Sequence, residues 1–349
     1  MSVTSFAQAA RSTVHRSSEA TGGSSARLDI LGLCNALVDI LVQVDEADIR
    51  SLGLTKGIMH LVDGPRQQFV LKHLGTRART EELGGSVLNA VRALAGLGRR
   101  TGFVGMVSDD DFGKRIKNRM QTLGIEAHLS NHPSESTGSC VILITPDGER
   151  TMNTSLGASR LYSETSVPHA VIARARMVHF SGYQWDTEGQ KNAINSALAS
   201  ARKAGALVSF DVSDPFVIER HRDDFLTIID RDADVVFANR EEARLLYGST
   251  AEDAGRKIAA TGAIGVIKLG ADGALVCRDK EEIRIPPVPT KLVDTTAAGD
   301  MFAAGFLHGL IGDRPLDVCG RMAASLASDV ISRVGATLSP AAIERVAKM

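Results

Sequence analysis

A chain of 349 residues, 44% of them hydrophobic, is long enough to bury one large α/β core or two smaller ones, which excludes disorder over most of its length. Its 40 basic and 41 acidic residues give a net charge of -1, without the basic excess typical of proteins that bind nucleic acid or anionic membranes. No segment approaches the roughly 18 to 20 consecutive apolar residues of a membrane span. We therefore expect a cytoplasmic protein whose partners include neither nucleic acid nor a membrane.

The first 26 residues are rich in Ser, Ala and Thr, and we expect residues 1–26 to be a disordered tail. A transit peptide has a similar composition and stays open as an alternative. The four cysteines, Cys34, Cys140, Cys277 and Cys319, lack the spacing of a zinc site. We expect them to be reduced, mostly buried thiols.

From residue 27 onward, short apolar runs alternate with patterns typical of helices. The runs LDILGLCNALVDILVQV, TGFVGMVS, MVHFSGY, LVSFDVS and GVIKLGADGALVC are separated by helical patterns such as SVLNAVRALAGLG and KNAINSALASARKAG. The alternation predicts an α/β domain over residues 27–345, with a mainly parallel sheet sandwiched by helices. Ligands bind beyond the carboxyl ends of such strands, so polar residues that end apolar runs are candidate site residues.

Two stretches interrupt this alternation, GIMHLVDGPRQQ at 57–68 and TGSCVILITPDGERTMNTSLG at 137–157. Within the second stretch, TPDGER is a turn between two strand-like runs. We interpret residues of about 40–68 together with 137–157 as a small inserted β-lid. A lid over a cleft can exclude water and complete an active site.

Two motifs near the N-terminus can bind a hydroxylated ligand. In GLCNALVDI, Asn35 and Asp39 can donate to and accept from vicinal hydroxyls, and a capping or turn role is the alternative. In ELGGSVLNAVRALAGLG, Gly84 and Gly85 let the backbone approach a ligand, and Asn89 projects one helical turn later. A plain turn followed by a helix cap is the alternative for this second motif.

Two motifs in the C-terminal half have equally simple structural interpretations. In VVFANREEA, Asn239 and Glu242 fit a capping box, with Asn239 as the cap and Glu242 three residues into the helix. In VIKLGADGALV, Lys268, Gly270 and Gly273 lie around a strand-turn-strand, which a plain hairpin would explain.

The segment DTTAAGDMFAAGFLHGL at 294–310 places small residues directly before an apolar helix. The free N–H groups and the dipole at a helix start make an anion site, and Ala297, Ala298 and Gly299 leave room for a phosphate. Asp300 has two interpretations. It either stabilises the helix start, or it accepts the proton of a substrate hydroxyl while the N–H groups hold a phosphoryl group.

Taken together, these motifs resemble the ribokinase-like (PfkB) family of carbohydrate and nucleoside kinases, whose signature D-T-x-G-A-G-D is similar to DTTAAGD here. The resemblance covers nearly all of residues 28–340, with Ala297 in place of the first signature glycine. It implies a ribokinase-like fold and transfer of the ATP γ-phosphoryl group to a primary hydroxyl, with ATP and Mg²⁺ as cofactors. A lid of this family either pairs with a second subunit or stays single, so monomer and homodimer are both open.

The resemblance also implies roles for individual residues. Asp300 would be the base, the backbone at Ala297, Ala298 and Gly299 the anion hole, and Arg150 a lid residue that swings onto the transferring phosphate; for Arg150 a surface salt bridge is the alternative. Glu242 would hold Mg²⁺ through water, and Asp294 lies where many relatives bind a monovalent cation such as K⁺, unless it merely caps a turn. The substrate-binding residues would be Asn35, Asp39, Gly84, Gly85, Asn89 and Asn153. The nucleotide-binding residues would be Asn239, Lys268, Gly270, Gly273 and Thr295.

The stretches HFSGYQWDTEGQ and FDVSDPF resemble bacterial adenosine kinases more closely than hexose kinases, so we expect adenosine as acceptor and AMP as product. An aromatic content of only 4% leaves few rings to stack on a purine. A sugar kinase acting on ribose, fructose or a keto-deoxy sugar acid is therefore an alternative. A catalytically silent binding or regulatory relative is an alternative of another class, but such a relative would be expected to lose Asp300 or Gly299.

Overall fold

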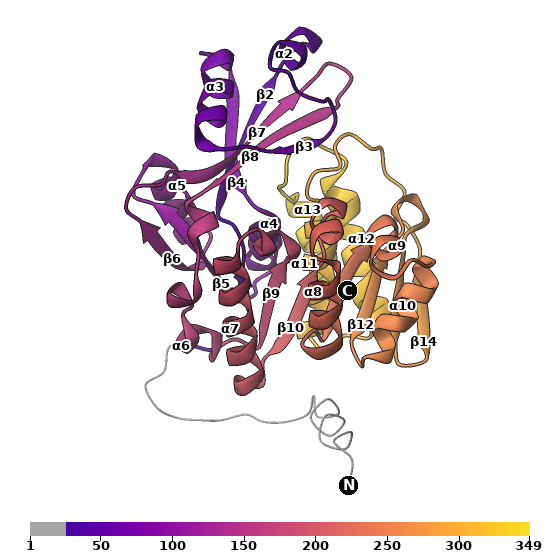
Figure 1. The fold of residues 1–349 in the computed structure, drawn as a ribbon. Coiled ribbons are helices and arrows are strands. Elements are labelled where there is room, and N and C mark those ends of the chain that lie inside the picture. Colours follow the sequence, from indigo (N-terminus) through magenta and orange to yellow (C-terminus); the bar gives the residue numbers. More distant parts are fainter. Residues whose placement is uncertain (1–25) are drawn as a thin grey trace.

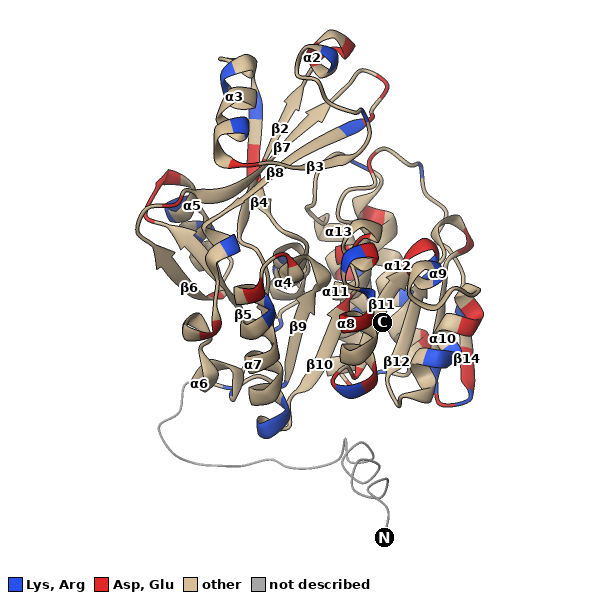
Figure 2. Ribbon diagram, in the orientation of Figure 1, with Lys and Arg blue, Asp and Glu red and all other residues tan. Residues whose placement is uncertain are grey.

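The computed structural model describes residues 26–349 and contains two β-sheets flanked by helices (Figure 1). The tail expected over residues 1–26 lies, apart from Ala26, outside the described residues. Among the described residues, no helix has the length and apolar character needed to cross a membrane. Basic and acidic residues are interspersed along the elements of both parts of the molecule (Figure 2), in keeping with the net charge of -1.

The larger sheet has nine strands and confirms the predicted α/β class with a mainly parallel sheet. In spatial order its strands are β14 (Glu281–Ile285), β13 (Ala274–Arg278), β12 (Ile264–Lys268), β11 (Val235–Asn239), β10 (Leu207–Asp211), β9 (Met177–Ser181), β1 (Ile30–Leu33), β5 (Thr101–Ser108) and β6 (Glu126–His132). Strands β12 to β6 in this order are parallel, and β13 and β14 extend the sheet as antiparallel strands.

Helices cover both faces of the larger sheet because alternate side chains of each central strand point to opposite sides. Val236 of β11 packs into one apolar cluster, and its neighbours Val235 and Phe237 pack into the other. The helices of the first cluster are α6 (His169–Ile172), α7 (Glu188–Ala204), α8 (Pro215–Arg231), α9 (Arg240–Tyr247) and α10 (Ala251–Ala260). The helices of the second cluster are α4 (Ser86–Gly96), α11 (Ala298–Ile311), α12 (Leu316–Val330) and α13 (Pro340–Ala347).

The smaller sheet has five strands and stands apart from the larger one, at the top of the molecule in Figure 1. Its strands are, in order, β3 (Met59–Leu61), β8 (Arg150–Gly157), β7 (Thr137–Ile144), β2 (Leu37–Gln43) and β4 (Arg79–Gly84). The ranges proposed for the lid supply β3, β7, β8 and most of β2. They do not include β4, whose sequence RTEELG carries charged side chains in place of the apolar alternation that predicts a strand.

The two faces of the smaller sheet differ in what they contact. One face, with Val38 and Ile40, packs against α2 (Glu46–Ser51), α3 (Gly64–Leu74) and α5 (Asp111–Thr122). We call the opposite face the inner face. Its residues alternate with those of the helix-covered face: Asp39, Leu41, Cys140, Ile142, Ile144, Arg150, Met152 and Thr154. Four of these, Leu41, Cys140, Ile142 and Ile144, form a separate buried apolar cluster with Met152 packed against it.

The four cysteines are buried and unpaired, as expected from their spacing.

Candidate active site

Asp300 lies in the first turn of α11, at the point where the sequence predicts an anion site. Ala297 precedes the helix in the left-handed conformation, with φ 57°, and no side chain caps the first N–H groups of the helix. The Lys268 ammonium group lies beside this turn, because a Cβ placed on Gly299 would be 3.3 Å from Lys268 Nζ. Uncapped N–H groups, a helix dipole and a lysine together favour a bound anion.

The Asp300 carboxylate accepts two hydrogen bonds from α4. Ser86 Oγ donates to Oδ1 at 2.6 Å, and Asn89 Nδ2 donates to Oδ2 at 2.9 Å. Burial raises the pKa of Asp300 to about 6, against the lowering effect of Ser86 and Asn89. Asp300 is therefore a stronger base than an ordinary aspartate and is still mostly ionised at neutral pH, as a general base requires.

Asp39 lies on the inner face and contributes a second perturbed carboxylate. Burial raises its pKa to about 7, and the positive charges of Arg92 and Arg150 act in the opposite direction. Gly84 is required beside it, since a Cβ at Gly84 would collide with the Asp39 carboxylate. This close approach of backbone and carboxylate is consistent with a site for an acceptor's hydroxyls.

Asn35 and Gly85 lie where the chain passes between the two sheets. Asn35 is buried, donates through Nδ2 to the Tyr183 carbonyl at 3.0 Å, and accepts through Oδ1 from Gln190 Nε2 at 2.9 Å. Gly85 has φ 100°, and a Cβ there would collide with the Asn35 carbonyl oxygen. Both residues thus hold the crossing between the sheets, and the Asn35 amide already has partners for its oxygen and nitrogen.

The ends of β10, β11 and β12 bring three further groups together. Lys268 Nζ donates to Asp211 Oδ2 at 3.2 Å. Burial raises the pKa of Glu242 to about 7, with Lys268 lowering it and Asp211 raising it. Burial lowers the pKa of Lys268, but the negative charges of Asp211, Glu242 and Asp300 outweigh that effect and the net shift is upward.

The capping box expected at Asn239 is present. Asn239 Oδ1 accepts from the Glu242 N–H at 2.9 Å, and Glu242 Oε2 accepts from the Asn239 N–H at 2.6 Å. No cluster of three or more acidic, histidine or cysteine side chains with metal-binding geometry occurs within residues 26–349. Glu242 and Asp211 are carboxylates, the ligand type that Mg²⁺ prefers, and Mg²⁺ usually keeps several waters and few direct protein ligands.

Arg150 reaches from the smaller sheet to the loop before α11. Its Nη1 lies 2.9 Å from Asp294 Oδ1, and the two side chains are only 13% and 5% exposed. The Asp294 carboxylate also accepts from the N–H groups of Thr296 and Gly335, each at 2.9 Å. The salt bridge and the turn cap are both present, and the salt bridge is buried, not superficial.

This ion pair bears on the monovalent cation expected at Asp294, which stays a prediction. In this conformation the guanidinium of Arg150 already supplies the positive charge, and two N–H groups use the remaining acceptor capacity. In this conformation protein groups therefore match the charge of the Asp294 carboxylate. Arg150 Nε and Nη2 are buried without a hydrogen-bond partner, so two donors of the guanidinium are still available beside the anion site.

The predicted hairpin around Gly270 and Gly273 is also confirmed. Strands β12 and β13 are antiparallel, joined by the 3₁₀ turn η4 (Gly270–Asp272). Gly273 has φ 84°, and a Cβ there would collide with the Ile285 carbonyl, so the protein backbone alone explains this glycine. Thr295 is exposed, and its carbonyl accepts from the Ala298 N–H at 3.2 Å, next to the anion site.

The structure corrects the placement of Asn153. Its side chain is fully buried on the helix-covered face of β8, opposite to Arg150, and its carbonyl accepts from Gln67 Nε2 of α3 at 3.2 Å. Because side chains alternate along a strand, positions 150 and 153 point to opposite faces. Asn153 therefore does not reach the substrate in this structure.

Sequence reasoning assigned no site role to Ser86 or Arg92, and it pointed to Asp211 only as a polar residue that ends an apolar run. Ser86 is a common helix-capping residue, so its hydroxyl gave no signal of a contact with Asp300. Asp211 ends a buried strand, and the rule that ligands bind beyond strand ends does point to it. Arg92 is one turn beyond Asn89 on α4, a spacing that places both side chains on one helix face.

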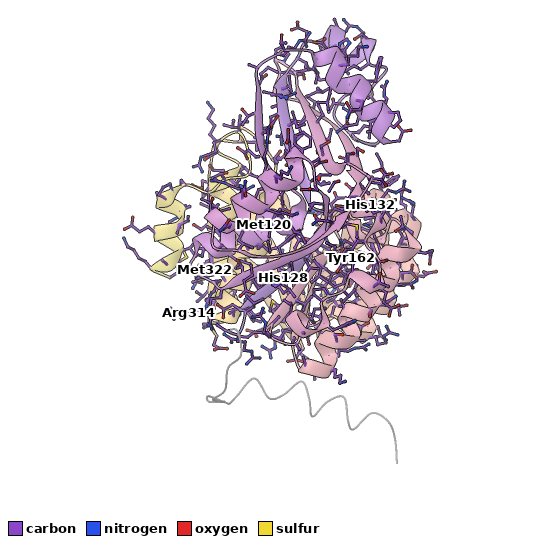
Figure 3. All side chains as sticks on the ribbon, turned by 90° about the vertical axis from the view of Figure 1, so that its left-hand side faces the viewer. Met120, His128, His132, Tyr162, Arg314 and Met322 are labelled. Carbon is purple, nitrogen blue, oxygen red and sulfur yellow. The ribbon has the colours of Figure 1, made fainter. Side chains whose placement is uncertain are left out.

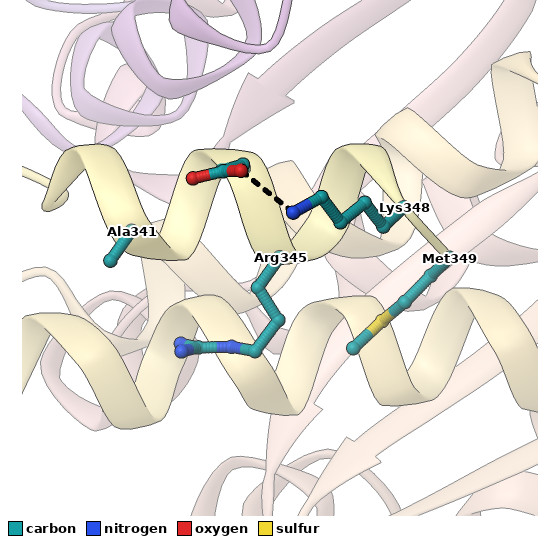
Figure 4. A pocket seen from close by; sticks show the side chains of 5 residues that line it. Ala341, Arg345, Lys348 and Met349 are labelled. Atoms are coloured by element: carbon teal, nitrogen blue, oxygen red, sulfur yellow. Dashed lines mark hydrogen bonds and ion pairs between the residues drawn. The ribbon is translucent and has the colours of Figure 1, made fainter.

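Other features of the described chain do not form a second centre. His179 and His308 are held by Ser209 and Arg99, and burial lowers the pKa of each to about 4. His128 and His132 lie on the edge strand β6 (Figure 3). A hollow at the C-terminal helix is lined by Ala341, Glu344, Arg345, Lys348 and Met349, and Lys348 pairs with Glu344 at 2.7 Å (Figure 4).

Comparison with known proteins gives the family. The model of the pfkB family of carbohydrate kinases matches residues 66–342. The chain belongs to this family. It is therefore a phosphotransferase that acts on an alcohol group, with a ribokinase-like fold.

Relatives of two kinds are similar to the chain. A probable sugar kinase from Rhizobium etli and an adenosine kinase from Sinorhizobium meliloti are each 32% identical, with TM-scores of 0.86 and 0.84, and each comparison covers 93% of this chain and 99% of the other. Adenosine kinase 2 of Arabidopsis thaliana is 26% identical over 90% of this chain and 97% of its own length. A 5-dehydro-2-deoxygluconokinase of Clostridium perfringens is 30% identical over 66% of this chain and 72% of its own length.

Proposed function

We propose that the protein transfers the γ-phosphoryl group of ATP to the primary hydroxyl of a nucleoside, with adenosine as the preferred acceptor and AMP as the product. The observation that carries this choice is the inner face of the smaller sheet. Leu41, Cys140 and Ile142 belong to a buried apolar cluster, with Met152 packed against it, on the same face as Asp39. A nucleoside matches this arrangement, since its ribose hydroxyls suit Asp39 and its base suits an apolar surface.

The expected reaction uses Asp300 as the base. Asp300 Oδ1 and Oδ2 are held by Ser86 and Asn89, so the carboxylate is oriented before an acceptor arrives. It takes the proton of the hydroxyl as that oxygen attacks the γ-phosphorus and ADP leaves. The first N–H groups of α11 and Lys268 stabilise the negative charge of the transferring group.

Mg²⁺ would be held by phosphate oxygens and, through water, by Glu242, and it would neutralise charge on the phosphates. The two donors of Arg150 that have no partner, Nε and Nη2, could also neutralise phosphate charge. A guanidinium that leaves Asp294 can bind the transferring phosphate. The smaller sheet then serves as the lid, which consists of residues 40–68 and 137–157 together with β4. The lid excludes water that would otherwise hydrolyse ATP.

A sugar kinase is the second candidate function. The relatives support it, because a probable sugar kinase is as similar to the chain as an adenosine kinase. Asp39 would serve a sugar as well as a ribose, but a free sugar offers no apolar group to match the apolar cluster of the inner face. A catalytically silent relative is disfavoured, since Asp300, its two donors and the uncapped helix start are all present.

The test is ADP release with a panel of acceptors: adenosine, other nucleosides, ribose, fructose and 5-dehydro-2-deoxygluconate. We expect the highest kcat/KM with adenosine, and a roughly 10²- to 10⁴-fold loss in Asp300→Asn. Asp313→Asn, which changes an exposed acid just after the other end of α11, is the matched control and should keep full activity. A higher kcat/KM for any free sugar would contradict the nucleoside assignment.

A further inference from the structure

Arg92 lies on α4 one turn beyond Asn89 and has no place in the reaction described above. Its guanidinium donates hydrogen bonds to four protein groups. Nη1 donates to the Leu83 carbonyl at 2.7 Å and to Asn89 Oδ1 at 3.3 Å. Nη2 donates to the Ala336 carbonyl at 3.3 Å and to Thr337 Oγ1 at 3.1 Å.

These contacts determine which way the Asn89 amide points. An arginine only donates hydrogen bonds and an ionised carboxylate only accepts them. The atom of Asn89 that faces Arg92 must therefore be the oxygen, and the atom that faces Asp300 must be the nitrogen, as the structure has them. With Arg92 absent, only repulsion by the Asp300 carboxylate itself opposes a flipped amide, whose oxygen would lie against that carboxylate.

The guanidinium is itself held in place from two directions. Leu83 belongs to β4 of the smaller sheet, whereas Ala336 and Thr337 belong to the loop between α12 and α13. A planar fork with five donors can satisfy these acceptors together, which a lysine ammonium on a flexible stem cannot do in the same geometry. Arg92 is thus fixed before substrate binds, as a residue that orients another must be.

The charge of Arg92 acts on the same site. It lowers the pKa of Asp39, although burial has the larger and opposite effect. Asp300 and Arg92 also interact electrostatically. The other titratable or charged groups that interact with Asp300 are Cys34, Asp39, Tyr183, Asp211 and Lys268.

We propose that Arg92 is a positioning residue for phosphoryl transfer: by donating to Asn89 Oδ1, it holds the Asn89 amide with its nitrogen toward Asp300 and so keeps the base oriented and ionised. The inference rests on Asp300 as the base. It does not depend on whether the acceptor is adenosine or a sugar.

The experiment compares Arg92→Met, Asn89→Leu and the double variant with the wild type. Arg99→Met is the matched control, because Arg99 is also partly buried but bonds only to His308 at the far end of α11. The pH dependence of kcat is measured with the acceptor that the screen selects. The pKa of the Asp300 carboxyl is measured by ¹³C NMR on the substrate-free proteins, so that this arm needs no activity.

We expect Arg92→Met to lower kcat roughly 10- to 100-fold and to move its acidic limb to higher pH, because Asp300 loses an oriented donor. The NMR pKa of Asp300 should rise in the same variant and stay unchanged in Arg99→Met. Adding Arg92→Met to Asn89→Leu should lower kcat by no more than about threefold further, since both changes remove the same interaction.

An unchanged Asp300 pKa in Arg92→Met would overturn the proposal, as would losses of kcat that multiply in the double variant. Thermal unfolding identifies a variant that does not fold. In that case Arg92→Lys, which keeps the charge without the fork, is measured in its place: a raised Asp300 pKa and a lowered kcat support the proposal, and wild-type values for both overturn it. If no acceptor is phosphorylated, the kinase assignment fails, while the NMR titration still tests Arg92.

Discussion

Replacing Arg150 with methionine leaves the Asp294 carboxylate buried, with only the N–H groups of Thr296 and Gly335 as donors. Breaking a buried ion pair by removing one partner costs about 3 to 5 kcal/mol. The two remaining hydrogen bonds to a charged acceptor reduce this penalty, so we expect Arg150→Met to destabilise the protein by about 2 to 3 kcal/mol. Adding Asp294→Asn should restore about half of that loss, because no charge then stays buried and unpaired.

The measurement is the free energy of unfolding in urea for the wild type, both single variants and the double variant. Potassium chloride is compared with tetramethylammonium chloride at equal ionic strength. If the guanidinium fills the place of a cation, potassium should stabilise Arg150→Met more than the wild type. A loss below about 0.5 kcal/mol in Arg150→Met would refute the buried pair, since that is the range of an exposed salt bridge. Equal stabilisation of both proteins by potassium would contradict the idea that the Arg150 guanidinium and potassium compete for one place beside Asp294.

Four further predictions follow from single residues. Because the pKa of Asp300 is raised to about 6, its neutral form stabilises the folded state below pH 4, and this contribution is lost as pH rises through 6. The free energy of unfolding in urea at pH 7 should therefore be about 1 to 2 kcal/mol higher in Asp300→Asn than in the wild type, although the variant loses activity. Ala297→Gly should raise the free energy of unfolding in urea by about 0.5 to 1 kcal/mol, since a φ of 57° strains alanine. A lowered free energy of unfolding would argue against that strain. Met152→Gln should raise KM for adenosine roughly tenfold with little change in kcat, as expected for a residue that only binds the base. Asn153→Leu should leave KM for the acceptor unchanged in steady-state assays, and a raised KM would return Asn153 to the site.

The parts of the fold that the sequence predicts are those where burial dictates composition. Strands covered on both faces, such as β5, need continuous apolar runs, and these runs are visible in the sequence. Strand β4 was not visible, because its side chains Glu81 and Glu82 are charged and only its pairing with β2 makes it a strand. Pairing between distant segments leaves no periodic signal in either of them.

The site shows a similar division. Asp300 and the small residues before it are recognisable because a helix start and its dipole follow from local sequence. The contacts of Ser86 and Asn89 with Asp300 join residues more than 200 positions apart, and nothing in either segment specifies the partner. The face on which Asn153 lies depends on the register of β8 against β7, which a shift of one residue would reverse.

In several motifs the same residues fit both the structural role and the proposed chemical role. Asn239 and Glu242 form a capping box, and the carboxylate that this box holds interacts electrostatically with Lys268 and Asp211. The hairpin at Gly270 ends β12 at the point where Lys268 reaches the start of α11. A structural role is therefore no argument against a chemical one here, because an active site of oriented charges needs each side chain to be fixed by contacts of its own. Burial of Asp39, Glu242 and Asp300 raises the pKa of all three, and this is a free-energy cost that the fold bears to hold the three carboxyl groups in place.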